Sequence, residues 1–448
     1  MQNNLISRFK SKFFNDIHLK EILKGSFIAF VFRIFGMGLG YIFILFIARW
    51  YGAEAVGSFS LSFTLLHIFV TIGVFGFDNA LVKFIADYNS NDNPHLVKEI
   101  YTKSLFVTIP LAIILSVFLY HNANFFAVNV FKNETLEVFF QITSYAIVPF
   151  VLLRINGGVF RGLKDIKHYS WTGNPGIYLV SVVILLIASI KDFDSTITII
   201  SQCVAIGVMM LVSFIYIKKH TYIFRTISQN ILRYKEILKV SLPMLLTSSM
   251  TLVMGWTDII MLGVFMSEEE VGVYSVVVKI AVITSIFLMA INTIAAPKFS
   301  ELYSKRDMEG LKNIAQSSTK MIFYSTLPII LVLTLFPKFI LGIFGEDFII
   351  GIGALWILMF GQLVNTITGS VGLILNMTGK QVLFNKIIIF SSIVNIVLNY
   401  FFIQIYGVIG AALSTTISIC FLHLTPFFFV KHYYGFYTFN ISNLLRSK

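Results

Sequence analysis

The feature that most constrains this chain is an apolar stretch near its start that is long enough to cross a membrane. From Gly25 to Ile47 the only charged side chain is that of Arg33. About 20 apolar residues in a helix span the roughly 30 Å hydrocarbon core of a bilayer. At about 1.5 Å per residue from Lys24, Arg33 lies roughly 13 Å deep. A charge at that depth is expected to face protein or water rather than lipid.

The same stretch returns later in the chain. Without a gap, residues 23–96 align with residues 238–311, and polar positions match as well as apolar ones. The matched pairs include Lys24/Lys239, Ser26/Ser241, Gly40/Gly255, Glu54/Glu269, Val56/Val271, Gly57/Gly272, Lys83/Lys298, Phe84/Phe299 and Tyr88/Tyr303. We interpret this as a duplicated unit, so that the chain has two related halves.

Composition excludes a soluble protein. Hydrophobic residues make up 57% and charged residues 12% of the 448 residues, and the mean hydropathy is +0.83. Such a chain has too little polar surface to cover a globular domain of this size. The apolar runs are continuous, whereas barrel strands would show about ten alternating residues each. The predicted fold class is an all-α polytopic membrane protein.

The apolar runs predict twelve transmembrane helices. They cover residues 25–47, 56–77, 104–120, 138–160, 173–190, 196–217, 240–262, 271–294, 319–336, 351–376, 384–404 and 407–430. Six spans per half is an even number, so both halves enter the membrane in the same orientation. We therefore expect two parallel six-helix repeats around a central cavity.

The cations set the topology. Of 34 Lys and Arg residues, the outer loops hold only Arg49, Lys132, Lys191 and Lys338 when the N-terminus is placed in the cytoplasm. By the positive-inside rule, both termini are then cytoplasmic. The net charge of +12 is explained in this way, and no nucleic-acid partner is predicted.

The predicted domains follow from the repeat and from a long basic connector between the halves. They are a cytoplasmic interfacial segment at 1–24, an N-terminal six-helix lobe at 25–217, a basic cytoplasmic linker at 218–239, a C-terminal six-helix lobe at 240–430 and a cytoplasmic tail at 431–448.

Ionisable residues inside spans are the candidate functional residues, because inserting a charge costs about 2.5–3.5 kcal/mol. Arg33 and Arg154 lie in the inner half of the first lobe and are expected to meet one anion. Asp258 and Lys279 lie in the outer half of the second lobe. They form either a structural salt bridge or a functional pair, with Lys279 contacting substrate or a gate and Asp258 coupling transport to a proton or cation.

Two further residues have a structural and a functional interpretation. Asp78 closes the second span, where it is either a solvated helix end or a coupling or gating residue. His67 lies deeper and is either a hydrogen-bonded structural residue or a proton relay. The sequence contains no phosphate-binding loop, metal-binding motif or serine elbow, so no metal or other cofactor is predicted.

Several segments together resemble one family. They are NIVLNYFFIQIYGVIGAALSTTISIC at 395–420, NMTGK at 376–380, GGVFRGLKD at 157–165 and the opening KGS, the arginine at 33 and ARWYGAEAVGSFS. In order and spacing they resemble the polysaccharide flippases. These are the O-antigen and capsule repeat-unit translocases of the multidrug/oligosaccharidyl-lipid/polysaccharide exporter superfamily.

The resemblance implies a V-shaped pair of bundles whose cationic cavity opens alternately to either side of the bacterial plasma membrane. The implied cargo is an undecaprenyl-diphosphate-linked oligosaccharide, with downstream polymerase and chain-length proteins as further partners. It also implies that Arg33, Arg154 and Lys279 are the cavity cations. Asn395 and Asn399, one turn apart on one helix face, match the family's asparagine pair and are predicted to contact the cargo. Helix packing is the alternative explanation for them.

Three other functions are weighed against this one. A cation-coupled multidrug antiporter of the same superfamily would bind its cargo through acidic residues, whereas the candidates here are mostly cationic. A peptidoglycan-lipid flippase usually carries two further helices. A membrane-embedded polysaccharide polymerase would carry a large outer loop, and the longest one here, near His121 to Glu137, is short.

Overall fold

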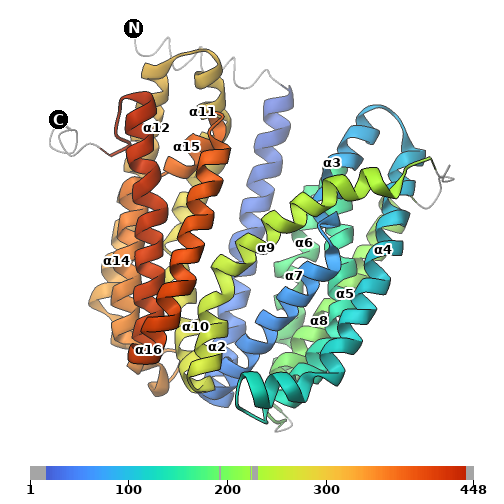
Figure 1. Cartoon of the computed structure of the whole chain (residues 1–448), viewed down its shortest axis with the longest axis vertical. Helices are drawn as coiled ribbons and strands as arrows, with labels where there is room; N and C mark the ends of the chain where they lie inside the picture. Colours follow the sequence, from blue (N-terminus) through green and yellow to red (C-terminus); the bar gives the residue numbers. More distant parts are fainter. Residues whose placement is uncertain (1–16, 191–192, 222, 224–230, 440–448) are drawn as a thin grey trace.

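The computed structural model describes residues 17–190, 193–221, 223 and 231–439, which form helices and no strand (Figure 1). In the first half these are α2 (Ile17–Val74), α3 (Phe77–Ser90), α4 (Pro94–His121), the π-helix η1 (Phe125–Val130), α5 (Leu136–Gly162), α6 (Ile166–Thr172), α7 (Asn174–Ala188) and α8 (Ile197–His220). The second half comprises α9 (Tyr234–Phe265), α10 (Glu268–Val282), α11 (Ser285–Ser304), α12 (Met308–Leu335), α13 (Pro337–Gly342), the 3-10 helix η3 (Glu346–Gly351), α14 (Ile352–Thr368), α15 (Val371–Met377) and α16 (Gln381–Tyr434). The predicted all-α membrane fold is confirmed.

The predicted domain boundaries stay predictions. Most of the predicted interfacial segment 1–24, the middle of the linker 218–239 and the end of the tail 431–448 lie outside the described residues. The predicted start of the second lobe at residue 240 falls inside α9.

Two glycines kink the chain sharply where two predicted spans meet. Gly52 has φ 82° within α2, and Gly407 has φ 54° within α16. Glycine adopts positive φ without steric cost, so the chain turns sharply where a loop was expected. By length and hydropathy, eight helices of the described chain are candidate spans, or nine if α10 and α11, which are bent by 43°, form one. The count of twelve stays a prediction.

The two halves meet through a pair of repeat-related glycines. A Cβ on Gly57 would lie 1.8 Å from the carbonyl oxygen of Glu268, and one on Gly272 would lie 1.9 Å from that of Ala53. The backbones of α2 and α10 therefore touch reciprocally, which only glycine permits. This contact explains why both halves repeat a glycine at this position, Gly57 and Gly272.

The halves separate toward the opposite end of the molecule. We call the end with the glycine contact the Gly52 end and the other the Ile17 end. One buried apolar core runs through the first half and into the part of the second half near the Gly52 end. A separate core, which includes Phe299, Leu311 and Val430, occupies the second half near the Ile17 end. Figure 1 shows the two groups of helices diverging in this direction.

The repeat-related helices α2 and α9 differ in how they cross between the groups. At the Ile17 end, α9 packs on the first half, where Glu99 of α4 accepts hydrogen bonds from the backbone N–H groups of Ile231 and Leu232 at 3.0 and 2.6 Å. The matching part of α2 stands between the groups (Figure 1). Its side chains include the exposed Phe27 and Phe35.

Candidate functional site

Asp78 lies in the first turn of α3, directly after a sharp bend. Phe75 and Gly76 have φ of 53° and 74°, so two consecutive residues are in the left-handed region. This bend turns Asp78 toward α5, where it is buried, with a relative exposure of 3%. The interpretation of Asp78 as a solvated helix end is therefore wrong. Sequence alone does not reveal the bend, because Phe75 is a residue that rarely adopts positive φ.

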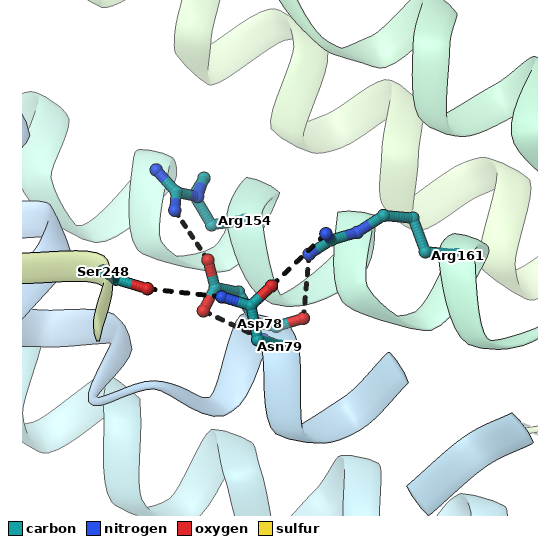
Figure 2. Close-up of polar contacts among 5 residues, drawn as sticks. All are labelled: Asp78, Asn79, Arg154, Arg161 and Ser248. Atoms are coloured by element: carbon teal, nitrogen blue, oxygen red, sulfur yellow. Dashed lines mark hydrogen bonds and ion pairs between the residues drawn. The ribbon is translucent and has the colours of Figure 1, made fainter. Parts of the chain in front are cut away.

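Asp78 forms an ion pair with Arg154 of α5 (Figure 2). The distance from Arg154 Nη2 to Asp78 Oδ2 is 2.6 Å. The side chain of Arg154 is 34% exposed, whereas that of Asp78 is 4% exposed. The second carboxylate oxygen, Oδ1, accepts the backbone N–H of Asn79 at 2.9 Å. The pair therefore uses one guanidinium nitrogen and leaves the cation partly open to its surroundings.

A second arginine of α5 holds the same turn from the other side. Arg161 Nη2 donates to the main-chain oxygen of Asp78 at 2.9 Å, and Nη1 donates to Asn79 Oδ1 at 3.3 Å (Figure 2). The guanidinium also lies 5.2 Å from the ring centroid of Tyr169. Its Nε is buried and donates to no acceptor among the described residues. Two guanidinium groups thus hold this turn, Arg154 through the carboxylate of Asp78 and Arg161 through its main-chain oxygen.

This cluster also contacts the second half of the chain. Asn79 Nδ2 donates to Ser248 Oγ of α9 at 3.3 Å (Figure 2). Gly76 permits the approach, because a Cβ there would lie 2.2 Å from the carbonyl oxygen of Ser241. Gly158 of α5 likewise permits the approach of α3, since a Cβ there would lie 2.6 Å from the main-chain oxygen of Asp78.

Arg33 is not brought to Arg154. It is exposed on the part of α2 that stands between the groups of helices. It forms no hydrogen bond or ion pair with another described residue, whereas Arg154 is paired with Asp78. The expectation that the two arginines meet one anion stays a prediction, with Arg154 in the better-defined position.

His67 packs among aromatic rings. Its ring stacks on Trp256 of α9 at a centroid distance of 5.1 Å and contacts the edges of Phe63 and Phe150 at 4.5 and 5.2 Å. Because α2 and α9 belong to different halves, this stack is a contact between them. A movement of one half relative to the other would therefore change the stack of His67 on Trp256.

A second polar cluster surrounds Asp258 of α9. Asp258 Oδ2 accepts hydrogen bonds from the hydroxyls of Tyr274, at 2.8 Å, and Thr415. Its Oδ1 accepts from Asn399 Nδ2 at 2.5 Å, and the same amide donates to Asn395 Oδ1 at 3.1 Å. The prediction that the two asparagines share one helix face is confirmed. All of these donors are neutral, and Asn399 Oδ1 is buried without a partner among the described residues.

Lys279 does not neutralise Asp258, so the salt-bridge interpretation is wrong. Its Nζ lies 5.8 Å from the ring centroid of Tyr178, in the first half. The main-chain oxygen of Lys279 accepts the hydroxyl of Tyr41 at 2.6 Å, which again joins the halves. Although the two residues lie on consecutive helices, Lys279 faces the first half while Asp258 is held by α10 and α16.

Several residues of both clusters were not singled out from the sequence. Arg161 follows Arg154 by two helical turns and so lies on the same face of α5, a signal that could have identified it. Tyr274 and Thr415 carry no such signal, because neutral hydroxyls are common in apolar helices. Among the described residues, no group of three or more His, Cys, Asp or Glu side chains could hold a metal ion.

The fold and these clusters define a multi-span membrane transporter with charged groups among the helices of both halves. The family model described as "Polysaccharide biosynthesis protein" matches residues 22–303, more than half of the chain. The chain therefore belongs to the polysaccharide biosynthesis protein family. The MatE model matches residues 243–401.

Individual relatives agree with this assignment. The chain is 24% identical over 401 residues to the probable low-salt glycan biosynthesis flippase Agl15 of Haloferax volcanii, covering 89% of this chain and 81% of that protein. It is 23% identical over 416 residues to the capsular polysaccharide biosynthesis protein CapF of Staphylococcus aureus, covering 90% and 97%. These relatives are named for transport or polysaccharide biosynthesis and not for catalysis.

Solved structures share the fold. The lipid II flippase MurJ in an inward closed conformation matches with a TM-score of 0.75 at 15% identity, covering 93% of this chain and 88% of that chain. An inward-facing multidrug resistance MATE family transporter matches with a TM-score of 0.74 at 17% identity, covering 92% and 96%. These structures show that the fold is shared, and the family model and the relatives confirm the predicted resemblance to the polysaccharide flippases.

Proposed function

We propose that this protein is a flippase that moves an undecaprenyl-diphosphate-linked oligosaccharide from the cytoplasmic to the outer leaflet of a bacterial plasma membrane. The Ile17 end faces the cytoplasm in this proposal, in accord with the distribution of Lys and Arg. The divergence of the helices toward that end corresponds to a state open to the cytoplasm. Rocking of the two halves about the contact of Gly57 with Gly272 would expose the site to the other side.

The observation that carries the proposal is Arg154. Its side chain is 34% exposed although it lies within the predicted fourth span, and one bond to Asp78 leaves several of its donors available. Guanidinium groups bind phosphate oxygens through paired, charge-assisted hydrogen bonds. A diphosphate cannot cross hydrocarbon unpaired, so such a cation is what an anionic head group requires.

Further cations lie along the same route. Arg33 is exposed between the groups of helices at the Ile17 end, and Lys279 lies beside the contact between the halves. We assign both as residues that contact the head group before or after it binds Arg154. His67, stacked on Trp256, is assigned as a gating residue because the stack must change when the halves move.

Asp258 is the proposed coupling residue. It is a carboxylate with neutral donors only, so a proton or a monovalent cation would lower the cost of its charge within the membrane. Asn395 and Asn399 were predicted as cargo contacts. Their hydrogen bonds instead favour a role in holding Asp258, to which Asn399 donates directly. Coupling through this residue would make flipping depend on an ion gradient. Polymerase and chain-length proteins that consume the flipped cargo are the proposed downstream partners.

The test is a leaflet assay with purified protein in vesicles, a fluorescent undecaprenyl-diphosphate oligosaccharide and a membrane-impermeant reagent. We expect protein-dependent flipping that Arg154→Gln abolishes and that Arg33→Gln and Lys279→Gln reduce. Lys338→Gln, an exposed cation on α13, is the matched control and should flip normally. Absence of flipping, together with gradient-driven efflux of an organic cation, would contradict the proposal and favour a drug antiporter that binds its cargo at Asp258.

A further inference from the structure

We propose that Asp78 is a resident counter-anion: it occupies Arg154 while no cargo is bound, and the diphosphate of the cargo displaces it. This inference rests on the proposed function and assigns a specific part to a residue that contacts the cargo only through Arg154. Asp78 is thus a positioning residue whose carboxylate competes with the cargo for one guanidinium.

The geometry places the cation in front of the anion. Arg154 is the exposed partner of the pair and Asp78 the buried one, at 34% and 4% exposure. An approaching anion therefore meets the guanidinium before it meets the carboxylate. The pair is held by a single bond from Nη2 to Oδ2, so the guanidinium can first bind phosphate oxygens through its other nitrogens and then release Asp78.

Charge explains why such a counter-anion is useful. A guanidinium without a partner is costly within a membrane, as is breaking a charge pair there. Asp78 removes that cost in the unloaded state. A diphosphate carries more negative charge and more acceptor oxygens than one carboxylate, so it can outcompete Asp78 for the same donors.

Asp78 remains stabilised after it is displaced. Its Oδ1 keeps the backbone N–H of Asn79 at 2.9 Å, at the start of α3, where the helix dipole favours negative charge. Arg161 holds the main-chain oxygen of the same residue at 2.9 Å and has a buried Nε without an acceptor among the described residues. The site therefore has more donor capacity than its own acceptors fill.

Hydrogen bonds of the neighbouring Asn79 can transmit the displacement of Asp78 to the second half of the chain. Asn79, the residue next to Asp78, is bonded both to Arg161 and to Ser248 of α9. A shift of the first turn of α3 would alter the bond to α9, which crosses between the two groups of helices. Binding of the head group would in this way bias the relative position of the halves.

The test is the affinity of the purified full chain for undecaprenyl diphosphate and for inorganic pyrophosphate, measured by calorimetry. Asp78→Asn keeps the shape and removes the competing charge, so we expect binding tighter by about tenfold. Asp78→Ser, which keeps an oxygen at the helix start, should act in the same direction if the first variant does not fold. The matched control is Asp87→Asn, an exposed aspartate on the same helix, and should bind as the unaltered chain does.

A residue that only orients Arg154 would behave in the opposite way. If removal of the Asp78 charge weakens binding, or leaves it unchanged, the counter-anion role is wrong. The leaflet assay on the unaltered chain keeps this outcome distinct from the proposed function. Flipping by the unaltered chain without tighter binding by Asp78→Asn would overturn only the counter-anion role, whereas absence of flipping would overturn the function itself.

Discussion

Each half of the chain holds an aspartate among its helices, and the two are stabilised in different ways. Asp78 is paired with Arg154 at 2.6 Å, so its cluster balances a negative with a positive charge. Asp258 accepts hydrogen bonds from Tyr274, Asn399 and Thr415, all of them neutral. The duplicated halves therefore do not repeat their polar sites. We propose that the first exchanges one anion for another and that the second binds a proton or a cation.

The largest expected effect is that of Arg154→Gln. This variant should abolish flipping and leave Asp78 with only the backbone N–H of Asn79 as a donor, at a cost toward the lower end of about 3–5 kcal/mol in stability. The measurements are the leaflet assay and thermal unfolding. The double variant Arg154→Gln/Asp78→Asn removes both charges and should regain most of the stability without regaining flipping. Full flipping by either variant would contradict the role of this pair.

Asp258→Asn should distinguish the role of Asp258 from that of Asp78 most clearly. We expect loss of the dependence of flipping on an ion gradient, with little change in thermal stability. The new amide can be accommodated because Asn399 has a buried oxygen without a partner and can turn its amide to accept a bond. Asp347→Asn, at an aspartate of η3, is the control for the removed charge. Gradient dependence that survives in Asp258→Asn would remove the coupling role.

Tyr274→Phe sharpens the comparison with a smaller change. It removes one of the donors to Asp258 from a side chain that is itself buried. We expect a loss of stability of about 1–3 kcal/mol, because the carboxylate loses a hydrogen bond. Thermal unfolding measures this loss, and Tyr400→Phe, at an exposed tyrosine of α16, should unfold as the unaltered chain does. Equal stability of the two variants would show that the donor is dispensable.

Asn79→Ala should have the smallest effect on stability. It removes two bonds of 3.3 Å, to Arg161 and Ser248, which together contribute about 1 kcal/mol. Affinity for undecaprenyl diphosphate should stay unchanged. The flipping rate should fall, because head-group binding is no longer coupled to α9 through the bond from Asn79 to Ser248. Asn91→Ala, at the exposed end of α3, is the control. An unaltered flipping rate would exclude Asn79 from the link between the halves.

The sequence predicted the class of fold and the residues that carry charge, but not how they pair. Apolar run length and the repeat are local signals, so the helices and the glycine pair at 57 and 272 could be found. The pairing of Asp78 with Arg154 depends on a bend at Phe75 and Gly76 that no pattern indicates. Similarly, proximity along the chain suggested a bond between Asp258 and Lys279, whereas the rotation of each helix turns the two side chains apart.

The central claim is that Arg154 receives the anionic head group of the cargo. An experimental structure of the full chain in lipid nanodiscs with undecaprenyl diphosphate tests it most directly. We predict phosphate oxygens at about 2.7–2.9 Å from the guanidinium of Arg154, with Asp78 no longer bonded to it. A bound diphosphate that lies elsewhere while the bond from Arg154 to Asp78 remains intact would contradict the account.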